Sequence, residues 1–200
     1  MENEDVPSAR YDDIVTLAEE HDGVLTSGQA RKTGITDSVL ARLAQRGRLE
    51  RMARGVYRVP YFPHNRFSQY REAVLWAKAH RGPLDLALSH ETALAAYGIS
   101  DANPAAIHLT VPRAARLRRK TPKAIVLHRA VLGPDEVTVF EGLPLTSIAR
   151  TVSDLLAAGA RIDLAKQAIS GARREGFIGK TEAQRLRYRL RRYQAMGARP

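Results

Sequence analysis

The segment from Gly34 to Pro60 constrains the chain most, because it predicts a short helix followed at once by a basic β-hairpin. Thr36 suits the N-cap of this helix, since its hydroxyl can accept a backbone N–H, and Gly47 suits a left-handed end. At about 100° per residue, the helix divides into an apolar face and a small polar face. The apolar face holds Val39, Leu40, Leu43 and Ala44, and the polar face holds Ser38, Ala41, Arg42 and Gln45.

Arginines alternate with apolar residues after this helix. The apolar positions are Leu49, Met52, Val56, Tyr57 and Val59, and Ala53–Gly55 suits the tip of a hairpin. A recognition helix followed by such a hairpin is typical of a winged helix-turn-helix, in which Arg and Gln read base edges in the major groove. Arginines of the wing then contact phosphates. The DNA-binding residues predicted in this way are Ser38, Arg42, Gln45, Arg46, Arg48, Arg51, Arg54 and Arg58.

The placement of charge supports this interpretation. Residues 26–62 hold eight Lys or Arg residues against two acids, Asp37 and Glu50, so the local balance is 8 − 2 = +6. The preceding 25 residues are acidic. The alternative is a helix–hairpin corner of another small domain, with arginines on a solvated face. The contrast between neighbouring segments favours DNA binding.

The composition of the whole chain agrees with a nucleic-acid partner. A net charge of +11 and a pI near 10.4 favour a polyanion, through release of counterions from phosphates. A membrane surface is the competing polyanion, but the basic residues do not lie opposite a strong apolar stripe. No stretch approaches the about 18 apolar residues that span a bilayer. The acidic N-terminus is unlike a secretory signal and cysteine is absent, so we expect a cytoplasmic protein without a disulfide framework.

The residues around the Gly34–Pro60 segment complete a DNA-binding domain. Residues 11–21 have helical periodicity, Val24-Leu25 suits a short strand, and Thr26 can cap a second helix that Gly34 ends. Pro60 and Pro63 then break the pattern. We therefore predict two domains, a winged helix-turn-helix over residues 1–62 and a sheet-and-helix domain over residues 63–200.

The second domain is predicted to be α+β. Residues 67–81 and the segment after Ser89 suggest helices, and three short strands are expected around 107–111, 125–129 and 137–139. Thr146 can cap a further helix, and two final amphipathic helices are expected over 161–175 and 180–193. A second basic surface is predicted, either as solvated charge or as a contact for phosphates, an acidic partner or RNA. Its residues are Arg113, Arg116, Arg118, Arg119, Lys120, Arg189 and Arg192.

No catalytic, cofactor or metal site is predicted. His90-Glu91 lacks the second histidine of a zinc-protease helix and is interpreted as a helix N-terminus with a favourably placed acid. His108 and His128 are expected to be neighbours on a polar sheet face, without a third ligand. A restriction-like nuclease needs an Asp and a Glu-x-Lys on adjacent strands, whereas Asp163 and Glu182 fall in predicted helices.

Four segments together resemble the AbiEi-type antitoxins of type IV toxin–antitoxin and abortive-infection systems. They are GVLTSGQARKTGITDSVLARLAQRGRLERMARGVYRVP, LSHETALAAYGI, IHLTVP and GLPLTSIARTVSDL, which span about residues 11 to 190. The resemblance implies an N-terminal winged helix that represses the protein's own operon at inverted repeats of double-stranded DNA. It also implies a C-terminal domain that counteracts a cognate nucleotidyltransferase-like toxin, with or without direct contact.

Carried over by position, the resemblance makes Ser38, Arg42, Gln45 and Arg46 the reading residues and Arg54 the wing tip. Arg150 and Asp154 match the family motif as well, and a purely structural role stays open for them. Two other functions remain as alternatives. One is a plain winged-helix transcriptional regulator with a sensing or dimerising C-terminal domain, and the other is the metal-dependent nuclease.

Overall fold

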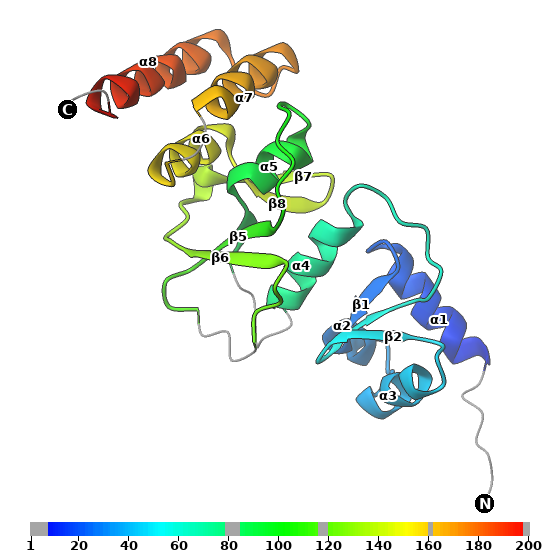
Figure 1. The fold of residues 1–200 in the computed structure, drawn as a ribbon. Helices are drawn as coiled ribbons and strands as arrows, with labels where there is room; N and C mark the ends of the chain where they lie inside the picture. Colours follow the sequence, from blue (N-terminus) through cyan, green and yellow to red (C-terminus); the bar gives the residue numbers. More distant parts are fainter. Residues whose placement is uncertain (1–7, 79–84, 116–119, 160–161, 198–200) are drawn as a thin grey trace, which may run out of the picture. The chain divides into compact units, whose positions relative to one another are not determined.

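The computed structural model describes residues 8–78, 85–115, 120–159 and 162–197 (Figure 1). Contacts divide the chain into two compact units, Met1–Pro83 and Leu84–Pro200. Within the described ranges, no helix is both long enough and apolar enough to cross a bilayer. Both units mix helices with a sheet, which confirms the predicted α+β class.

The first unit is a winged helix-turn-helix with one added helix. Its sheet is antiparallel, with strand order β1-β3-β2. The elements are α1 (Ser8–Glu19), β1 (Val24–Thr26), α2 (Ser27–Lys32), α3 (Asp37–Gln45), β2 (Glu50–Ala53), β3 (Val56–Arg58) and α4 (Ser68–Lys78).

Local signals fix the helix-turn-helix. The Thr26 hydroxyl accepts the Gln29 backbone N–H, and the Gln29 side chain accepts the Thr26 N–H, so α2 begins with a capping box. Gly34, with a φ of +80°, turns the chain into α3. Thr36 holds the N-cap position of α3, but its hydroxyl bonds the Ser38 hydroxyl at 2.8 Å instead of a backbone N–H. The predicted capping bond therefore does not form.

Helix α4 belongs with the first unit, although the Pro60–Pro63 break predicts a boundary after residue 62. Two ion pairs explain the difference: Arg71 of α4 pairs with Asp22, and Glu72 of α4 pairs with Arg58. The helix also packs against β1. The break thus marks a bend in the chain ahead of α4, and the two compact units divide after Pro83.

The second unit is a five-stranded mixed sheet with helices. The strand order is β6-β5-β4-β8-β7. Strand β4 is parallel to β8, and β5 is parallel to β6. The pairs β4–β5 and β7–β8 are antiparallel. The elements are β4 (Ala87–Leu88), α5 (His90–Tyr97), β5 (Ile107–Val111), β6 (Ile125–Arg129), a 3-10 turn (Pro134–Glu136), β7 (Val137–Phe140), β8 (Leu143–Thr146), α6 (Ile148–Ala157), α7 (Ile162–Arg174) and α8 (Lys180–Gly197).

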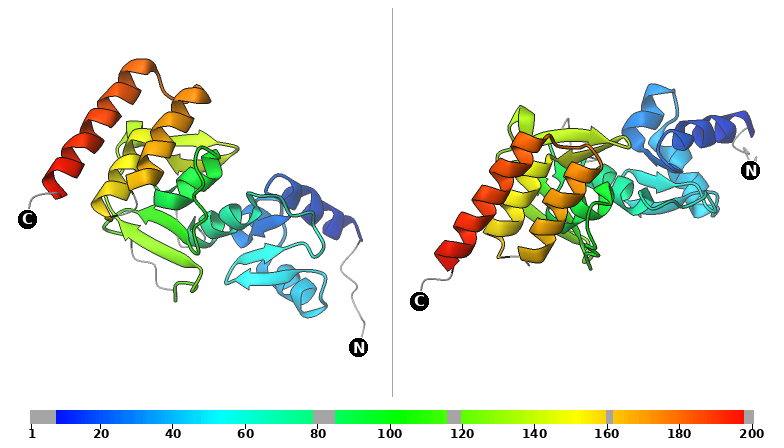
Figure 2. Two further views of the ribbon diagram at one scale, coloured as in Figure 1. Left: turned by 45° about the horizontal axis from the view of Figure 1, so that its top comes forward. Right: turned by 90° about the horizontal axis from the view of Figure 1, so that it is seen from above.

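The helices of this unit form layers on the sheet. Helix α5 contacts β5 and β8, α6 packs on α5, and α7 and α8 pack on α6 and on each other (Figure 2). Two strands, β4 and β8, were not predicted. Because Thr146 ends β8, Ser147 is the N-cap of α6, and its hydroxyl accepts the Arg150 N–H; the predicted Thr146 cap is wrong.

Helix α7 approaches the chain after α5 closely at Gly171. A Cβ built there would lie 2.2 Å from the Ile99 carbonyl oxygen, nearer than any side chain tolerates. Only glycine permits this contact. The stacking of α7 on the rest of the unit therefore depends on the absence of a side chain at this position.

We expect Gly171→Ala to lower the free energy of unfolding by about 1–3 kcal/mol, the usual cost of overpacking a close contact. Gly179→Ala serves as the matched control, because a Cβ at Gly179 meets nothing within 4 Å. Urea denaturation followed by circular dichroism measures both. Equal stability of the two variants would contradict the close approach of α7.

Candidate nucleic-acid interface

The core of the first unit sets the orientation of α3. Val39, Leu40 and Leu43 are buried against a cluster that includes Ile14 of α1 and Leu25 of β1. Burial of these three side chains turns the opposite face of α3 outward. On that face Ser38, Gln45 and Arg46 are exposed, while Ala41 and Arg42 are half-buried. The structure thus places the predicted reading residues together on one side of one helix.

The wing is short and tied to the start of α2. Arg51 pairs with Tyr57 and Ala53 with Val56, with an irregular register between them. Gly55, with a φ of +74°, makes the tip, and its carbonyl accepts the Ser27 N–H at 2.9 Å. Arg51 and Arg54 are exposed on this hairpin. They therefore lie on a hairpin whose tip is held against the start of α2.

Arg58 is placed differently from the other wing arginines. Its side chain is 15% exposed, lies 3.8 Å from Glu50 and also pairs with Glu72 of α4. Two carboxylates thus compensate its charge. Sequence periodicity predicts Arg58 as a DNA contact, and it does not show that Glu72 of α4 pairs with this residue.

Arg48 packs onto the first helix. Its guanidinium lies 4.0 Å from the centre of the Tyr11 ring, and the Tyr11 hydroxyl donates to the Arg48 carbonyl at 3.3 Å. Such a stacking contact contributes about 0.5–1 kcal/mol at an exposed site. The side chain remains exposed, so Arg48 joins the positive surface from a position supported by α1.

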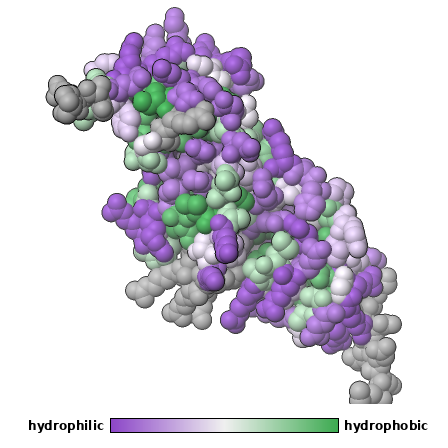
Figure 3. Space-filling model, viewed as in Figure 1, coloured by the Kyte–Doolittle hydropathy of each residue, from purple (hydrophilic) through white to green (hydrophobic). Residues whose placement is uncertain are grey.

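The second basic surface spreads over two elements of the second unit. Arg113 and Lys120 are exposed in the β5–β6 connection, whereas Arg189 and Arg192 are exposed on α8. Arg116, Arg118 and Arg119 lie outside the described residues. On α8, which packs on α6 and α7, Leu186 and Leu190 are buried. The end of the unit that holds α7 and α8 is mostly hydrophilic on the face seen in Figure 3.

Three histidines meet in the second unit. His108 and His128 are neighbours, as predicted, with 3.0 Å between Nδ1 of His108 and Nε2 of His128. The unpredicted third is His90, whose ring centre lies 3.7 Å from that of His128. His90 stands at the start of α5, directly after the unpredicted strand β4, so no local pattern links it to the other two.

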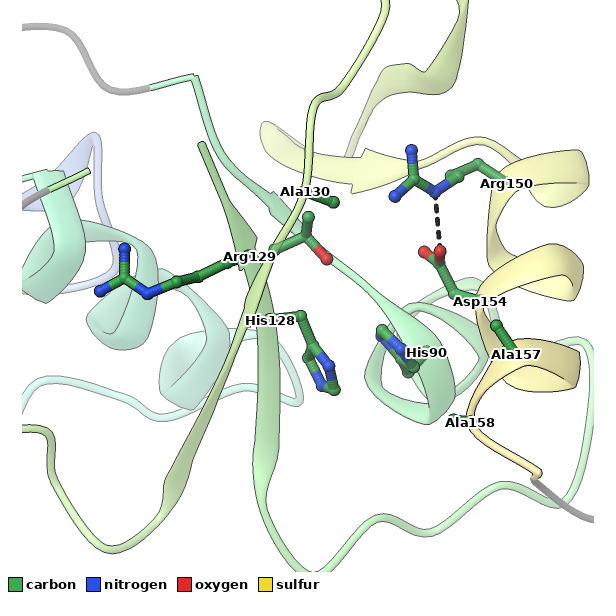
Figure 4. Close-up of a pocket in the computed structure, with 9 residues that line it drawn as sticks. His90, His128, Arg129, Ala130, Arg150, Asp154, Ala157 and Ala158 are labelled. Atoms are coloured by element: carbon green, nitrogen blue, oxygen red, sulfur yellow. Dashed lines mark hydrogen bonds and ion pairs between the residues drawn. The ribbon is translucent and has the colours of Figure 1, made fainter. Parts of the chain in front are cut away.

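Burial disfavours the charged form of these imidazoles. It lowers the pKa of His90 to about 3, with further contributions from His128, His108 and Arg150. Burial also lowers the pKa values of His108 and His128. His90 and His128 line a cavity of 270 Å³ together with Arg150 and Asp154 of α6 (Figure 4).

Arg150 and Asp154 form an ion pair beside this cavity. Nε of Arg150 donates to Oδ1 of Asp154 at 2.7 Å, and Nη1 donates to Glu136 at 2.8 Å. Burial raises the pKa of Asp154, against the opposing effect of Arg150. This geometry gives the two motif residues a structural role, joining α6 to the turn before β7.

Asp163 and Glu182, the two acids considered as ligands of a nuclease metal site, lie on separate helices. Asp163 is exposed in the first turn of α7, and Glu182 is exposed in the first turn of α8. Neither residue is on a strand, as predicted. A carboxylate pair on adjacent strands is therefore not built from these two residues.

Residues 12–60 match the family model of the AbiEi antitoxin transcriptional regulators. The matched segment runs from α1 to the end of β3 and so contains the recognition helix and the wing. This confirms the resemblance in the N-terminal part of the chain. Over this segment, which holds α2, α3 and the hairpin, the chain is similar to an AbiEi-type regulator domain.

The remaining comparisons bear on the fold. The crystal structure of the Rv2827c protein from Mycobacterium tuberculosis is similar to this chain, with a TM-score of 0.57 at 16% sequence identity. The alignment covers 98% of this chain and 73% of that one, so the similarity extends over both units. No curated protein sequence matches the chain.

We expect Arg58→Ala to lower the free energy of unfolding of the first unit by about 1–2 kcal/mol, between the values for exposed and buried ion pairs. Two carboxylates lose their partner in that variant. Arg54→Ala is the control and should change stability by no more than about 0.5 kcal/mol, as exposed positions usually do. Thermal unfolding compares the two variants, and a larger loss for Arg54→Ala would contradict the assignment.

Proposed function

We propose that this chain is an AbiEi-type antitoxin that represses its own operon through the winged helix and neutralises a nucleotidyltransferase-like toxin through its second unit. The observation that carries the proposal is the family match over residues 12–60. The matched segment contains α3 with its exposed polar face. The protein acts in the cytoplasm, and no enzymatic step is part of this function.

Helix α3 enters the major groove of the operator. Arg42 and Gln45 are one turn apart on its outer face, and both side chains can make paired hydrogen bonds to a base edge. Ser38 lies one turn towards the start of the helix, and Arg46 follows Gln45 at the end. Together these four residues recognise the base sequence of the operator.

The wing contacts the phosphate backbone beside the groove. Arg51 and Arg54 are exposed on the hairpin, and Arg48 adds charge between the hairpin and α1. Contacts of this kind fix the register of the protein on the duplex and carry no sequence information. Arg58 is left out of the contact set, because Glu50 and Glu72 hold its side chain.

Inverted repeats suit a domain of this kind. A single winged helix covers one half-site, and two copies bound to half-sites about 34–36 Å apart face the same side of the duplex. When two copies are joined as a dimer, the second half-site is bound intramolecularly, so the repeat binds far more tightly than one half-site.

The second unit is the part proposed to act on the toxin. Its exposed arginines on α8 suit an acidic protein surface, since charge complementarity speeds association and selects the partner. The competing function is a plain transcriptional regulator whose second unit dimerises or senses a ligand. The buried histidine cluster and its cavity give that alternative a specific observation in its favour.

Replacing Arg42 and Gln45 by Ala should flatten the preference for operator over scrambled duplex, at about 1–3 kcal/mol for each lost base contact. Replacing Arg51 and Arg54 by Ala should instead weaken binding to both duplexes alike. The slope of the logarithm of the binding constant against the logarithm of the salt concentration should become shallower by about 0.9 for each lost phosphate contact. Fluorescence anisotropy across a salt series measures both effects.

Arg173→Ala in α7 is the matched control, because it removes an exposed arginine outside the winged helix. It should leave both affinities unchanged. The docking proposal fails if the α3 variants weaken both duplexes equally while the wing variants weaken neither.

Reversing the charge of Arg189 and Arg192 to Glu should impair rescue of cells that express the toxin encoded in the same operon. Operator binding by the same variant should stay within about threefold of the original, since α8 is not part of the proposed DNA contact. Arg51→Ala with Arg54→Ala is the reciprocal control, which should lose DNA affinity and keep rescue. If rescue follows operator binding in every variant, the plain regulator replaces the antitoxin.

A further inference from the structure

The three histidines of the second unit come from three elements and converge on one point. His90 begins α5, His108 lies in β5, and His128 lies in β6, which runs parallel to β5. In the register of these strands, Thr110 pairs with His128, so His108 and His128 are diagonal neighbours on the same face. One ligand nitrogen from each ring lies within 4.8 Å of the other two.

These distances fit a metal site. Nitrogens bound about 2.0–2.1 Å from a tetrahedral zinc ion lie about 3.3 Å from one another. The 3.0 Å separation between Nδ1 of His108 and Nε2 of His128 is already close to that value. The His90 nitrogen lies within 4.8 Å of the other two, and the His90 ring has to turn out of its stack on His128 to complete the set.

We propose that His90, His108 and His128 form a binding site for a divalent transition-metal ion of the zinc class, with one coordination position open to the adjoining cavity. Neutral imidazole suits zinc and its neighbours, whereas magnesium and calcium require oxygen ligands. Three histidines with an open fourth position are a common arrangement in reactive zinc sites. The prediction from sequence, no metal site, omitted His90 and therefore lacked the third ligand.

Hydrogen bonds outside the three rings orient His90. Its Nδ1 lies 2.9 Å from the Ser89 hydroxyl, which leaves Nε2 for the metal. The Thr110 hydroxyl donates to Ser89 at 2.8 Å, and both hydroxyls are buried. Metal-ligating histidines usually hold their second nitrogen in this way, which fixes the direction of the ring.

The backbone at His90 is strained. Its φ of +54° lies in the left-handed region, although α5 begins at this residue. A non-glycine residue in that region costs about 1–3 kcal/mol, and such strain collects at ligand-binding positions. An ordinary helix start does not require this conformation.

The cavity supplies the open side of the site. It is lined by His90, His128 and Asp154, among others (Figure 4). Within the described chain, Oδ2 of Asp154 is buried without a hydrogen-bond partner, while Oδ1 accepts from Arg150. A carboxylate oxygen in this position suits a water molecule bound to the open coordination position of the metal.

An anion is a poorer occupant of the same cavity. Arg150 already donates to Asp154, to Glu136 and to the Val131 carbonyl, and Arg129 donates to the Ala115 carbonyl at 2.6 Å. Both guanidinium groups are therefore engaged within the protein. The histidine ring nitrogens offer lone pairs to the site, which suits a metal cation.

Cobalt(II) is the probe that tests the site, with the full chain prepared free of any histidine tag and first stripped with a chelator. We expect one equivalent to bind and to give the visible absorption bands of a four-coordinate ion, which zinc then displaces. His128→Asn should abolish the bands. His64→Asn, which changes an exposed histidine of the other unit, should keep them.

Ser89→Ala tests the orienting hydrogen bond and should weaken cobalt affinity by about 10–100-fold. Zinc should also raise the unfolding temperature of the original chain and not that of His128→Asn, because an ion that binds only the folded state stabilises it. Two outcomes overturn the proposal: no saturable cobalt binding by the original chain, or bands that persist in both His128→Asn and His108→Gln. The first of these needs no variant and therefore does not depend on how a variant folds.

Discussion

Burial of one face of α3 is the interaction on which the first unit depends. Val39, Leu40 and Leu43 enter a core shared by α1 and the small sheet, and each side chain is almost completely buried. Each such side chain contributes about 1.5–3 kcal/mol when fully buried. The same packing sets which face of α3 carries Arg42 and Gln45, so stability and the proposed DNA recognition depend on one helix orientation.

The recognition helix and the wing could be predicted because their signals are local. A period of 3.6 residues, glycines at Gly34 and Gly47 and a turn at Gly55 act over a few positions each. Strand β8 could not be predicted in the same way. It contains Pro144 between two neighbouring strands, and proline in a central strand argues against that assignment.

Strand β4 and the histidine cluster were missed for another reason. A strand of two residues, Ala87 and Leu88, is too short to show an alternating pattern. Because β4 delivers His90 to the sheet, the third member of the cluster is specified only by long-range pairing with β5 and β8. The ion pair of Arg58 with Glu72 could not be predicted either, because Glu72 belongs to a helix that follows the Pro60–Pro63 break.

Major-groove reading by α3 is the central claim, and methylation of operator DNA by dimethyl sulfate tests it most directly. The reagent reaches guanine N7 in the major groove and adenine N3 in the minor groove, so it separates the two faces of the duplex. The account predicts protection of guanine N7 in both half-sites by the original chain, and its loss with Arg42→Ala. Protection confined to adenine N3, with guanine N7 open throughout the operator, would contradict it.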